Sequence, residues 1–308
     1  MLFTLRRARQ RFSEKFRRLK RSDRKEAVKQ FKKRLGYEPP LTRPVSYNEK
    51  LTRFKLEADR PIFCQLADKL AVRDFVAGRL GDEYLIPLIA AMPRLTHELF
   101  DSLPDSFVIK ANHGSAMNHI VFNKDEITFE DLRWETDGWM CRDYSASSRE
   151  AQYRNIPPQL VIEKLITDAE SNIPSDYKLH CFNPGDGQRH AVIQVDSDRF
   201  GDHTRDYFDA NWQRLALRAK YPNSSLDNMP SRPEKLDSLV ETAWRLADGF
   251  AYVRVDLYVV RGHIYFGEMT FTPESGFMRF EPHEVDLQWG EWFDLQRQLA
   301  LYELEDIK

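Results

Sequence analysis

Two acidic residues in the C-terminal half of the chain are placed where they can hold a metal ion. Asp256 precedes and Glu268 follows the dipeptide Arg261-Gly262, and β-branched and aromatic residues flank this dipeptide on both sides. That pattern predicts two strands joined by a tight turn. In such a hairpin the two acids lie side by side on one face, where they repel each other unless a cation lies between them, and oxygen ligands suit Mg2+. The alternative is a surface hairpin whose acidic side chains face water.

A second segment, residues 107–122, combines a lysine with a glycine-containing loop. An apolar strand is expected to end at Lys110, a small polar loop with Gly114 and Ser115 follows, and the apolar run 120–122 predicts a return strand. Backbone N–H groups of such a loop can bind phosphate, and the lysine adds positive charge. Neither GxxxxGK nor GxGxxG is present. By itself the segment does not distinguish a phosphate-binding lysine from an ordinary lysine at the end of a strand.

In this order the two segments resemble the ATP-grasp superfamily, in which a lysine hairpin lies over the triphosphate and an Arg-x-Asp…Glu-x-Asn hairpin holds magnesium. The stretch VIEKLI resembles the strand whose backbone pairs with adenine. More narrowly, the chain resembles the TupA-like ATP-grasp proteins of teichuronopeptide biosynthesis, from about residue 46 to about residue 290. The segments that carry this resemblance are DKLAVRDFV (68–76), VIKANHGS (108–115), DYKLHCF (176–182), DRFGDHTRDYFD (198–209) and FGEMTFTPESG (266–276).

The resemblance implies ATP and Mg2+ as cofactors and assigns roles to individual residues. It implies metal binding by Asp256, Glu268 and Thr270, where Thr270 replaces the family's Asn. Arg254, Lys110 and Lys178 are the expected catalytic charges, with Arg254 stabilising an oxyanion. The residues expected to bind ATP are Lys110, His113, Gly114, Ser115, Asn118, Glu163, Lys164, Ile166, Asp176 and Lys178. The residues expected to bind an anionic substrate are Arg199, His203, Arg205, Ser275 and Gly276. A structural turn with surface ion pairs remains the alternative for residues 199–205.

The expected fold class is α+β, an ATP-grasp fold of two α/β subdomains whose antiparallel sheets clamp a nucleotide. The domains are a basic amphipathic helical arm (1–38), a helical segment (39–105), a lysine-hairpin subdomain with a lid-like insertion (106–165) and a C-terminal subdomain with the metal site (166–308). Capping patterns and apolar periodicity predict the remaining elements. These are a helix that starts at Ser46, helices over 62–76 and 236–250, a short strand at 85–89, strands at 159–167, 176–183 and 190–196, little regular structure over 123–157, and a turn that holds Arg199, His203, Arg205 and Asp206.

Charge is distributed unevenly along the chain. Residues 1–35 contain fifteen Lys or Arg and three acids, a net charge of +12, although the 308 residues together carry −2. Apolar residues in this arm recur at helical intervals, so it can lie on an anionic membrane surface, dock on the acidic remainder of the protein, or form a mobile tail. Nucleic-acid binding is disfavoured, because no aromatic stacking platform accompanies the basic residues.

Composition restricts the location and the kind of protein. With 42% apolar residues the chain can form a core, no apolar stretch is long enough to span a membrane, and no signal peptide is expected. Three cysteines without CxxC spacing argue against disulfides and structural zinc. The expected location is the cytoplasm, with the inner face of the membrane as an option for the basic arm.

The leading functional hypothesis is a ligase that forms an amide between an amine and a carboxylate through an acyl phosphate. The resemblance implies a role in surface-polysaccharide or cell-envelope assembly, with a glycan substrate that is lipid-linked in one version of the hypothesis. An alternative is a kinase that phosphorylates a sugar hydroxyl, for which Asp206 or His203 would serve as the base. A third is a non-catalytic nucleotide-binding scaffold.

Overall fold

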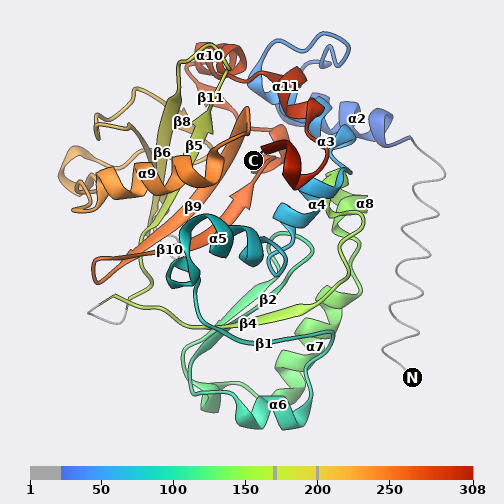
Figure 1. Cartoon of the computed structure of the whole chain (residues 1–308), viewed down its shortest axis with the longest axis vertical. Coiled ribbons are helices and arrows are strands. Elements are labelled where there is room, and N and C mark those ends of the chain that lie inside the picture. Colours follow the sequence, from blue (N-terminus) through green and yellow to red (C-terminus); the bar gives the residue numbers. More distant parts are fainter. Residues whose placement is uncertain (1–21, 169–171, 199–200, 308) are drawn as a thin grey trace.

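The computed structural model describes residues 22–168, 172–198 and 201–307. Two larger antiparallel sheets organise this part of the chain (Figure 1). The four-stranded sheet contains, in spatial order, β1 (Leu88–Met92), β4 (Leu160–Lys164), β2 (Phe107–Ala111) and β3 (Asn118–Val121). The five-stranded sheet contains β10 (His263–Thr270), β9 (Tyr252–Val260), β5 (Asp176–Phe182), β6 (His190–Ser197) and β7 (Thr204–Asp209). A small third sheet pairs β8 (Arg218–Ala219) with β11 (Phe280–Glu281).

Helices cover both larger sheets. The four-stranded sheet occupies the lower part of Figure 1 with α6 (His97–Ser102) and α7 (Phe129–Met140), and the five-stranded sheet occupies the upper part with α9 (Leu236–Ala247). The other α-helices are α2 (Asp23–Leu35), α3 (Tyr47–Glu57), α4 (Pro61–Ala67), α5 (Val72–Leu80), α8 (Tyr144–Ser148), α10 (Glu284–Trp292) and α11 (Leu295–Ala300). Short 3-10 helices lie at 82–84, 124–126, 151–153, 226–228, 273–276 and 304–307. The mixture of helices with antiparallel sheets is the predicted α+β class.

The larger core lies between the five-stranded sheet and the helices around it. It combines inward-facing residues of β5, β6 and β9 with residues of α3, α4, α5 and α9, and the fully buried Trp289 of α10 belongs to it. A second core lies between the four-stranded sheet and the helices that cover it, and it includes Phe107, Ile109, Leu132 and Ile162. The helices before residue 82 therefore share a core with strands that follow residue 175.

Several predicted elements are confirmed. Ser46 and Glu49 form the predicted capping box at the start of α3, the predicted helix after Leu236 is α9, and the predicted lysine and carboxylate hairpins are β2–β3 and β9–β10. Gly36 ends α2 in a left-handed conformation with φ of 91°, as a glycine at that position favours.

Three predictions are wrong. The continuous helix expected over 62–76 is broken, because Asp68 adopts an extended conformation after α4 and its side chain accepts from the Leu70 N–H at 2.8 Å. The stretch 123–157 has regular structure, since it contains the twelve-residue helix α7. Arg205 and Asp206 lie on β7 instead of in a turn, where they pair with β6.

The basic helix α2 is docked on the body of the protein. Ala27 and Phe31 are fully buried, and the Phe31 ring contacts the ring of Phe277 edge-on at 6.2 Å between centroids. Asp23 forms an ion pair with Arg149 at 2.9 Å. The half of the basic arm that the structure describes is thus a packed element, and residues 1–21 of the arm lie outside the described residues.

Candidate active site

The carboxylate hairpin brings Asp256 and Glu268 directly opposite each other. The two residues are register partners in the β9–β10 ladder, and an irregularity in the register between Phe266 and Glu268 makes Gly267 an extra, bulged residue. Without that bulge Asp256 would face Gly267, and Glu268 would be shifted to the other face. A Cβ at Gly267 would lie 2.8 Å from the Tyr258 ring and 3.1 Å from the Asp256 carbonyl oxygen. The glycine is therefore required for the close approach of the two strands.

Positive charges hold both carboxylates in place. Arg254 donates from Nε and Nη2 to the two oxygens of Asp256, at 2.7 and 2.8 Å, and Lys178 Nζ lies 3.7 Å from Asp256 Oδ2. Thr270 donates to Glu268 Oε1 at 2.9 Å and accepts from Arg254 at 2.9 Å. Its hydroxyl thus links the arginine to the glutamate, where the family pattern has an amide.

The charges around Glu268 keep it ionised. The enclosed position of Glu268 would raise the pKa of its carboxyl group, but Lys69, Arg254 and the Thr270 hydrogen bond outweigh this effect and lower the pKa to about 2. Burial likewise lowers the pKa of Arg254, yet the adjacent Asp256 carboxylate and its hydrogen bonds raise that pKa above its ordinary value. The site at neutral pH therefore contains a charged carboxylate and a charged guanidinium.

The donor set fits a magnesium ion that is shared with a phosphate-bearing ligand. Within the described residues no group of three or more His, Cys, Asp or Glu side chains is arranged to hold a metal. Mg2+ is commonly bound by one or two carboxylates together with phosphate oxygens. Asp256 and Glu268 supply this pair of oxygen ligands at adjacent positions of one ladder.

The lysine hairpin lies against a buried acidic residue. Lys110 Nζ is 2.5 Å from Glu163 on the neighbouring strand β4, and Arg73 Nη1 is 3.0 Å from the other oxygen of Glu163. In the loop after β2, a Cβ at Gly114 would lie 2.6 Å from Met117 and 2.7 Å from the Tyr144 ring. Only glycine fits this close contact, so the loop backbone is held tightly against the segment 144–153.

Lys69 connects the loop after β2 to the carboxylate hairpin. It lies in the break between α4 and α5, where its Nζ donates to the Gly114 carbonyl at 2.8 Å and lies 3.4 Å from Glu268 Oε2. Its backbone N–H donates to the Asn112 carbonyl at 3.3 Å. One cation thus faces both of the segments that sequence motifs had identified separately.

A cavity of about 250 Å3 lies between the two larger sheets, beneath the lysine hairpin. The predicted nucleotide and metal residues that line it are Lys110, Gly114, Ser115, Asn118, Glu163, Lys164, Ile166, Asp176, Asp256 and Glu268. The backbone N–H of Lys164 already donates a hydrogen bond to the Pro87 carbonyl oxygen, at 3.0 Å.

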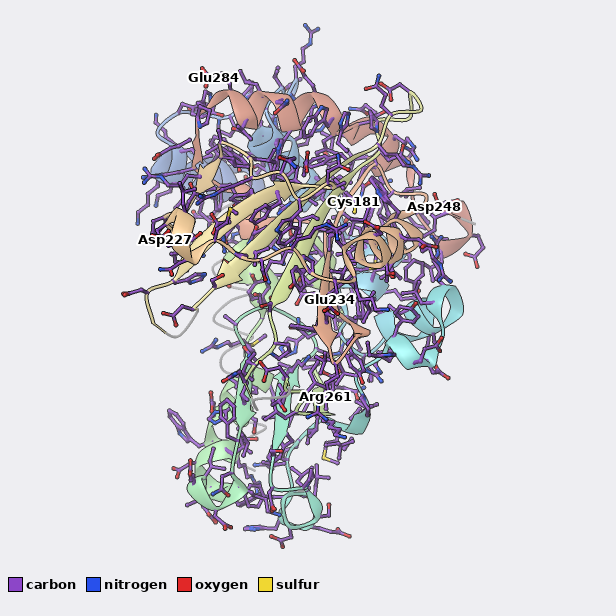
Figure 2. All side chains as sticks on the ribbon, turned by 90° about the vertical axis from the view of Figure 1, so that its left-hand side faces the viewer. Cys181, Asp227, Glu234, Asp248, Arg261 and Glu284 are labelled. Atoms are coloured by element: carbon purple, nitrogen blue, oxygen red, sulfur yellow. The ribbon has the colours of Figure 1, made fainter. Side chains whose placement is uncertain are left out.

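Figure 2 shows Arg261, at the β9–β10 turn, where the molecule narrows between its two parts.

A second, larger cavity of about 1030 Å3 adjoins the first, and Ser115 and Glu268 line both. The predicted catalytic and substrate residues in its lining are Lys178, Arg205, Arg254 and Ser275, and the predicted metal ligand Thr270 lines it as well. Seven Lys or Arg and three Glu residues line it, which makes the cavity cationic. Lys33 and Arg34 of α2 form part of this wall. Hereafter the two spaces are called the nucleotide cavity and the acceptor chamber.

Some predicted site residues lie elsewhere. His113 is 3% exposed and lines neither cavity. His203 contacts Asp196 at 2.8 Å and stacks on Tyr221, also outside both linings. Gly276 is buried behind the lining of the acceptor chamber, and Arg199 lies outside the described residues.

The structure adds residues that sequence motifs did not identify. Lys69, Glu150 and the α2 residues Lys33 and Arg34 enter the two cavities because of contacts between distant segments. For Lys69 there was one weak sequence signal, its position four residues before Arg73 in a stretch of helical periodicity. Lys33 and Arg34 belong to the basic arm, whose charge pattern allowed docking on the protein but indicated no cavity. For Glu150 there was no sequence signal.

Comparison with solved structures gives distant similarities. The D-alanine–D-alanine ligase of Bacillus anthracis is 17% identical, with a TM-score of 0.41, over 78% of this chain and 68% of the ligase. The corresponding enzyme of Helicobacter pylori is 16% identical, with a TM-score of 0.37, over 81% of this chain and 61% of that one. The phosphoribosylamine–glycine ligase of Thermotoga maritima is 12% identical, with a TM-score of 0.38, over 70% of this chain and 51% of the ligase. No curated protein matches the sequence.

A family comparison is more specific. The model of the TupA-like ATP-grasp family matches residues 49–294, which include both hairpins, Lys69 and most of the acceptor chamber but not α2. No described helix combines the length with the apolar composition that a membrane span needs. From the order of its hairpins, the cavity between its sheets and this match over most of its length, the chain belongs to the TupA-like ATP-grasp family.

Proposed function

We propose that this chain is an ATP- and Mg2+-dependent ligase that joins a carboxylate to an amine through an acyl phosphate. The observation that carries the proposal is the position of Glu268, which faces Asp256 across the ladder and lines both cavities. A phosphoryl group held at these carboxylates would leave the nucleotide cavity on one side and meet an acceptor on the other. Fold membership alone would not indicate this arrangement, because one fold supports several reactions.

The chain's own charges suit phosphoryl transfer. Bound Mg2+ would neutralise charge that develops on the transferred phosphoryl group. Lys110 and Lys69 place ammonium groups at the loop 112–118, and the loop backbone adds N–H donors. Arg254 lines the acceptor chamber, where it can stabilise the oxyanion that forms when an amine attacks the acyl group. A preorganised donor of this kind contributes on the order of 3–4 kcal/mol.

The acceptor chamber suits an anionic substrate. Its seven Lys or Arg residues outnumber its three glutamates, and four of the seven (Lys33, Arg34, Lys220 and Arg279) are exposed. A ring of cations raises the local concentration of anions and steers them inwards. We infer that the acceptor is a carboxylate of a glycan, such as a uronic acid of a surface polysaccharide. The two lysines and two arginines named here would contact parts of that glycan beyond the reacting unit.

The N-terminal residues allow the proposed enzyme to act at a membrane surface. Residues 1–21 carry nine Lys or Arg and one acid, and a basic segment of this kind binds anionic lipid at about 1 kcal/mol per residue near the surface. A lipid-linked glycan would then be presented at the inner membrane face. Flotation with liposomes that contain phosphatidylserine, of the protein with and without residues 1–21, tests this. Equal binding by both forms would contradict it, and α2 stays in place in both.

Product analysis tests the proposed function. Purified protein, ATP and Mg2+ are incubated with uronic acids and the amino acids, and ADP, free phosphate and amide are measured. Amide with ADP and free phosphate supports the ligase, whereas ADP with a phosphorylated sugar would establish the kinase. Asp256→Asn and Glu268→Gln should each remove turnover. Asp227→Asn changes an exposed carboxylate outside both cavities and serves as the matched control.

The kinase alternative has less support from the described residues. Asp206, one base suggested for it, is fully buried and forms an ion pair with Arg214 at 2.6 Å. His203, the other, contacts Asp196. Neither residue lines the nucleotide cavity or the acceptor chamber, so neither faces a position where a hydroxyl group could meet the phosphoryl group.

A further inference from the structure

Glu150 is a buried carboxylate in the wall of the acceptor chamber. The residue is 4% exposed, and it lines the chamber but not the nucleotide cavity. The two other acids of the chamber, Glu268 and Glu274, form ion pairs with lysine or arginine. Among the described residues no Lys or Arg nitrogen lies within 4.0 Å of the Glu150 carboxylate, although Lys55 interacts with it electrostatically from further away. Its charge is therefore not committed to an adjacent cation.

Hydrogen bonds hold Glu150 close to the metal-site strand. The Thr272 hydroxyl donates to Glu150 Oε2 at 2.8 Å, and Gln152 donates to that hydroxyl oxygen at 2.8 Å. Thr272 follows Thr270 by two residues, just beyond the end of β10. Two residues of extended chain span roughly 7 Å. The residue that donates to the Glu150 carboxylate is thus about one such step along the chain from Thr270.

The acceptor chamber is the space from which an amine would reach an acyl phosphate. The transferred phosphoryl group would lie next to Asp256 and Glu268, and Glu268, Arg254 and Thr270 all line the chamber. Glu150 lines the same chamber. An amine bound there would therefore share one space with the metal-site carboxylate Glu268, with Arg254 and with the buried carboxylate of Glu150.

We propose that Glu150 is the general base that takes the proton from the attacking amine, an inference that rests on the function proposed above. An ammonium group has no lone pair, so it must lose a proton before its nitrogen can attack. The new C–N bond then forms, the C–O bond to phosphate breaks, and phosphate leaves with that electron pair. Glu150 accepts the first proton, which the ammonium group must lose before it attacks, and returns it to solvent through the chamber. The nitrogen loses a second proton as the amide forms, and the departing phosphate takes that proton.

The surroundings of Glu150 suit such a base. Burial raises the pKa of its carboxyl group, and Lys55 and the hydrogen bonds from Thr272 and Ser275 oppose this effect only in part. A carboxylate with a raised pKa is a stronger base than an ordinary one. Burial lowers the pKa of Lys55 to about 8. The titratable groups that face Glu150 are Lys55 from α3, Glu268 from β10, and Tyr144 and Tyr153 from the segment 144–153, with Arg149 acting on Lys55.

The test separates the two half-reactions. Hydroxylamine is largely unprotonated at neutral pH and needs no base, so it traps an acyl phosphate as a hydroxamate. The full enzyme is given ATP, Mg2+ and glucuronate or galacturonate, with hydroxylamine or with the amino acids as the amine. For Glu150→Gln we expect hydroxamate formation to stay within about twofold of the wild type, while amide formation falls about 10²- to 10⁴-fold.

Controls distinguish a base from a structural contact. Glutamine at position 150 can still accept from Thr272, so thermal unfolding should show a folded protein. Glu126→Gln removes an exposed carboxylate of the same insertion and should leave both products unchanged. Glu150→Asp retains a base set back by one methylene group, so it should restore part of the amide formation. Its amide rate should still rise with pH through an ionisation that Glu150→Gln lacks.

The outcomes separate this inference from the proposed function. A wild-type enzyme that forms neither hydroxamate nor amide would overturn the ligase itself. If the wild type forms both, and Glu150→Gln loses both to the same extent or retains both, the ligase stands and Glu150 is not its base. Selective loss of the amide, with partial recovery in Glu150→Asp, is the result that supports the assignment.

Discussion

The glycine bulge of β10 offers the most direct perturbation of the site, because Gly267 sets the register that pairs Asp256 with Glu268. In Gly267→Ala the new methyl group would lie 2.8 Å from the Tyr258 ring and 3.1 Å from the Asp256 carbonyl oxygen. The ring can turn, but the carbonyl belongs to the ladder and cannot move without disturbing the pairing. Overpacking of this kind costs about 1–3 kcal/mol.

The effect on function should exceed the effect on stability. A metal-site carboxylate that moves by about 1 Å costs on the order of 10²-fold in rate, because the two oxygen ligands no longer face one ion. We expect Gly267→Ala to unfold a few degrees below the wild type, at about 2–4 °C per kcal/mol for a chain of this size class. Its affinity for ATP in the presence of Mg2+, measured by calorimetry, should fall by about tenfold or more.

The matched control lies in the same hairpin. Gly262 has φ of 75° at the β9–β10 turn and nothing within 4 Å of its added Cβ. Gly262→Ala therefore costs about 1–2 kcal/mol through backbone strain alone and leaves the carboxylates in register. If Gly267→Ala binds Mg2+ and ATP as well as Gly262→Ala does at equal loss of stability, the bulge does not position the metal site and the reasoning is refuted.

Three further perturbations test other contacts. Lys69→Met should weaken nucleotide binding by about tenfold in calorimetry, since no cation then joins the loop after β2 to Glu268; unchanged affinity would contradict this role. Lys33→Glu with Arg34→Glu should raise the KM for an anionic acceptor about tenfold without changing that for ATP, whereas Lys29→Glu, on the same helix but outside both cavities, should change neither. In metal-free protein, Glu268 has a pKa of about 2 against an ordinary glutamate value of 4.5, so its stabilising effect is complete above pH 4.5 and is lost as the pH falls toward 2. This contributes about 1–3 kcal/mol after allowance for partial exposure, and urea unfolding of Glu268→Gln should depend less on pH in that window. Parallel pH curves for the two proteins would refute it.

The carboxylate hairpin was predictable because its signals are local. A β-branched run on each side of Arg261-Gly262 fixes the turn, and a two-residue period then fixes which side chains share a face. The bulge at Gly267 was not itself predicted. It follows from the unequal spacing of the two acids, because Asp256 lies five residues before the turn dipeptide and Glu268 lies six residues after it. The lysine hairpin was predictable for the same reason, since β2 and β3 are separated by a short loop.

Contacts between distant segments could not be predicted. The break between α4 and α5 depends on Asp68, whose carboxylate accepts from the backbone of residue 70 and from the Asn112 side chain at 2.9 Å. Apolar periodicity through 62–76 favours a continuous helix, and a tertiary hydrogen bond outweighs it. Glu150 is hidden in the same way, because its partner Thr272 is 122 residues away in the sequence.

The N-terminal arm shows how charge patterning and packing give different answers for one segment. From periodicity alone, α2 could bind a membrane surface or pack on the protein, since Phe31 suits either environment. The structure buries Phe31 against Phe277 and turns Lys33 and Arg34 toward the acceptor chamber. The apolar face of α2 is already buried against the protein. The helix therefore cannot insert that face into a membrane while its cations line the chamber. Any attraction of the arm to lipid would therefore have to come from residues 1–21.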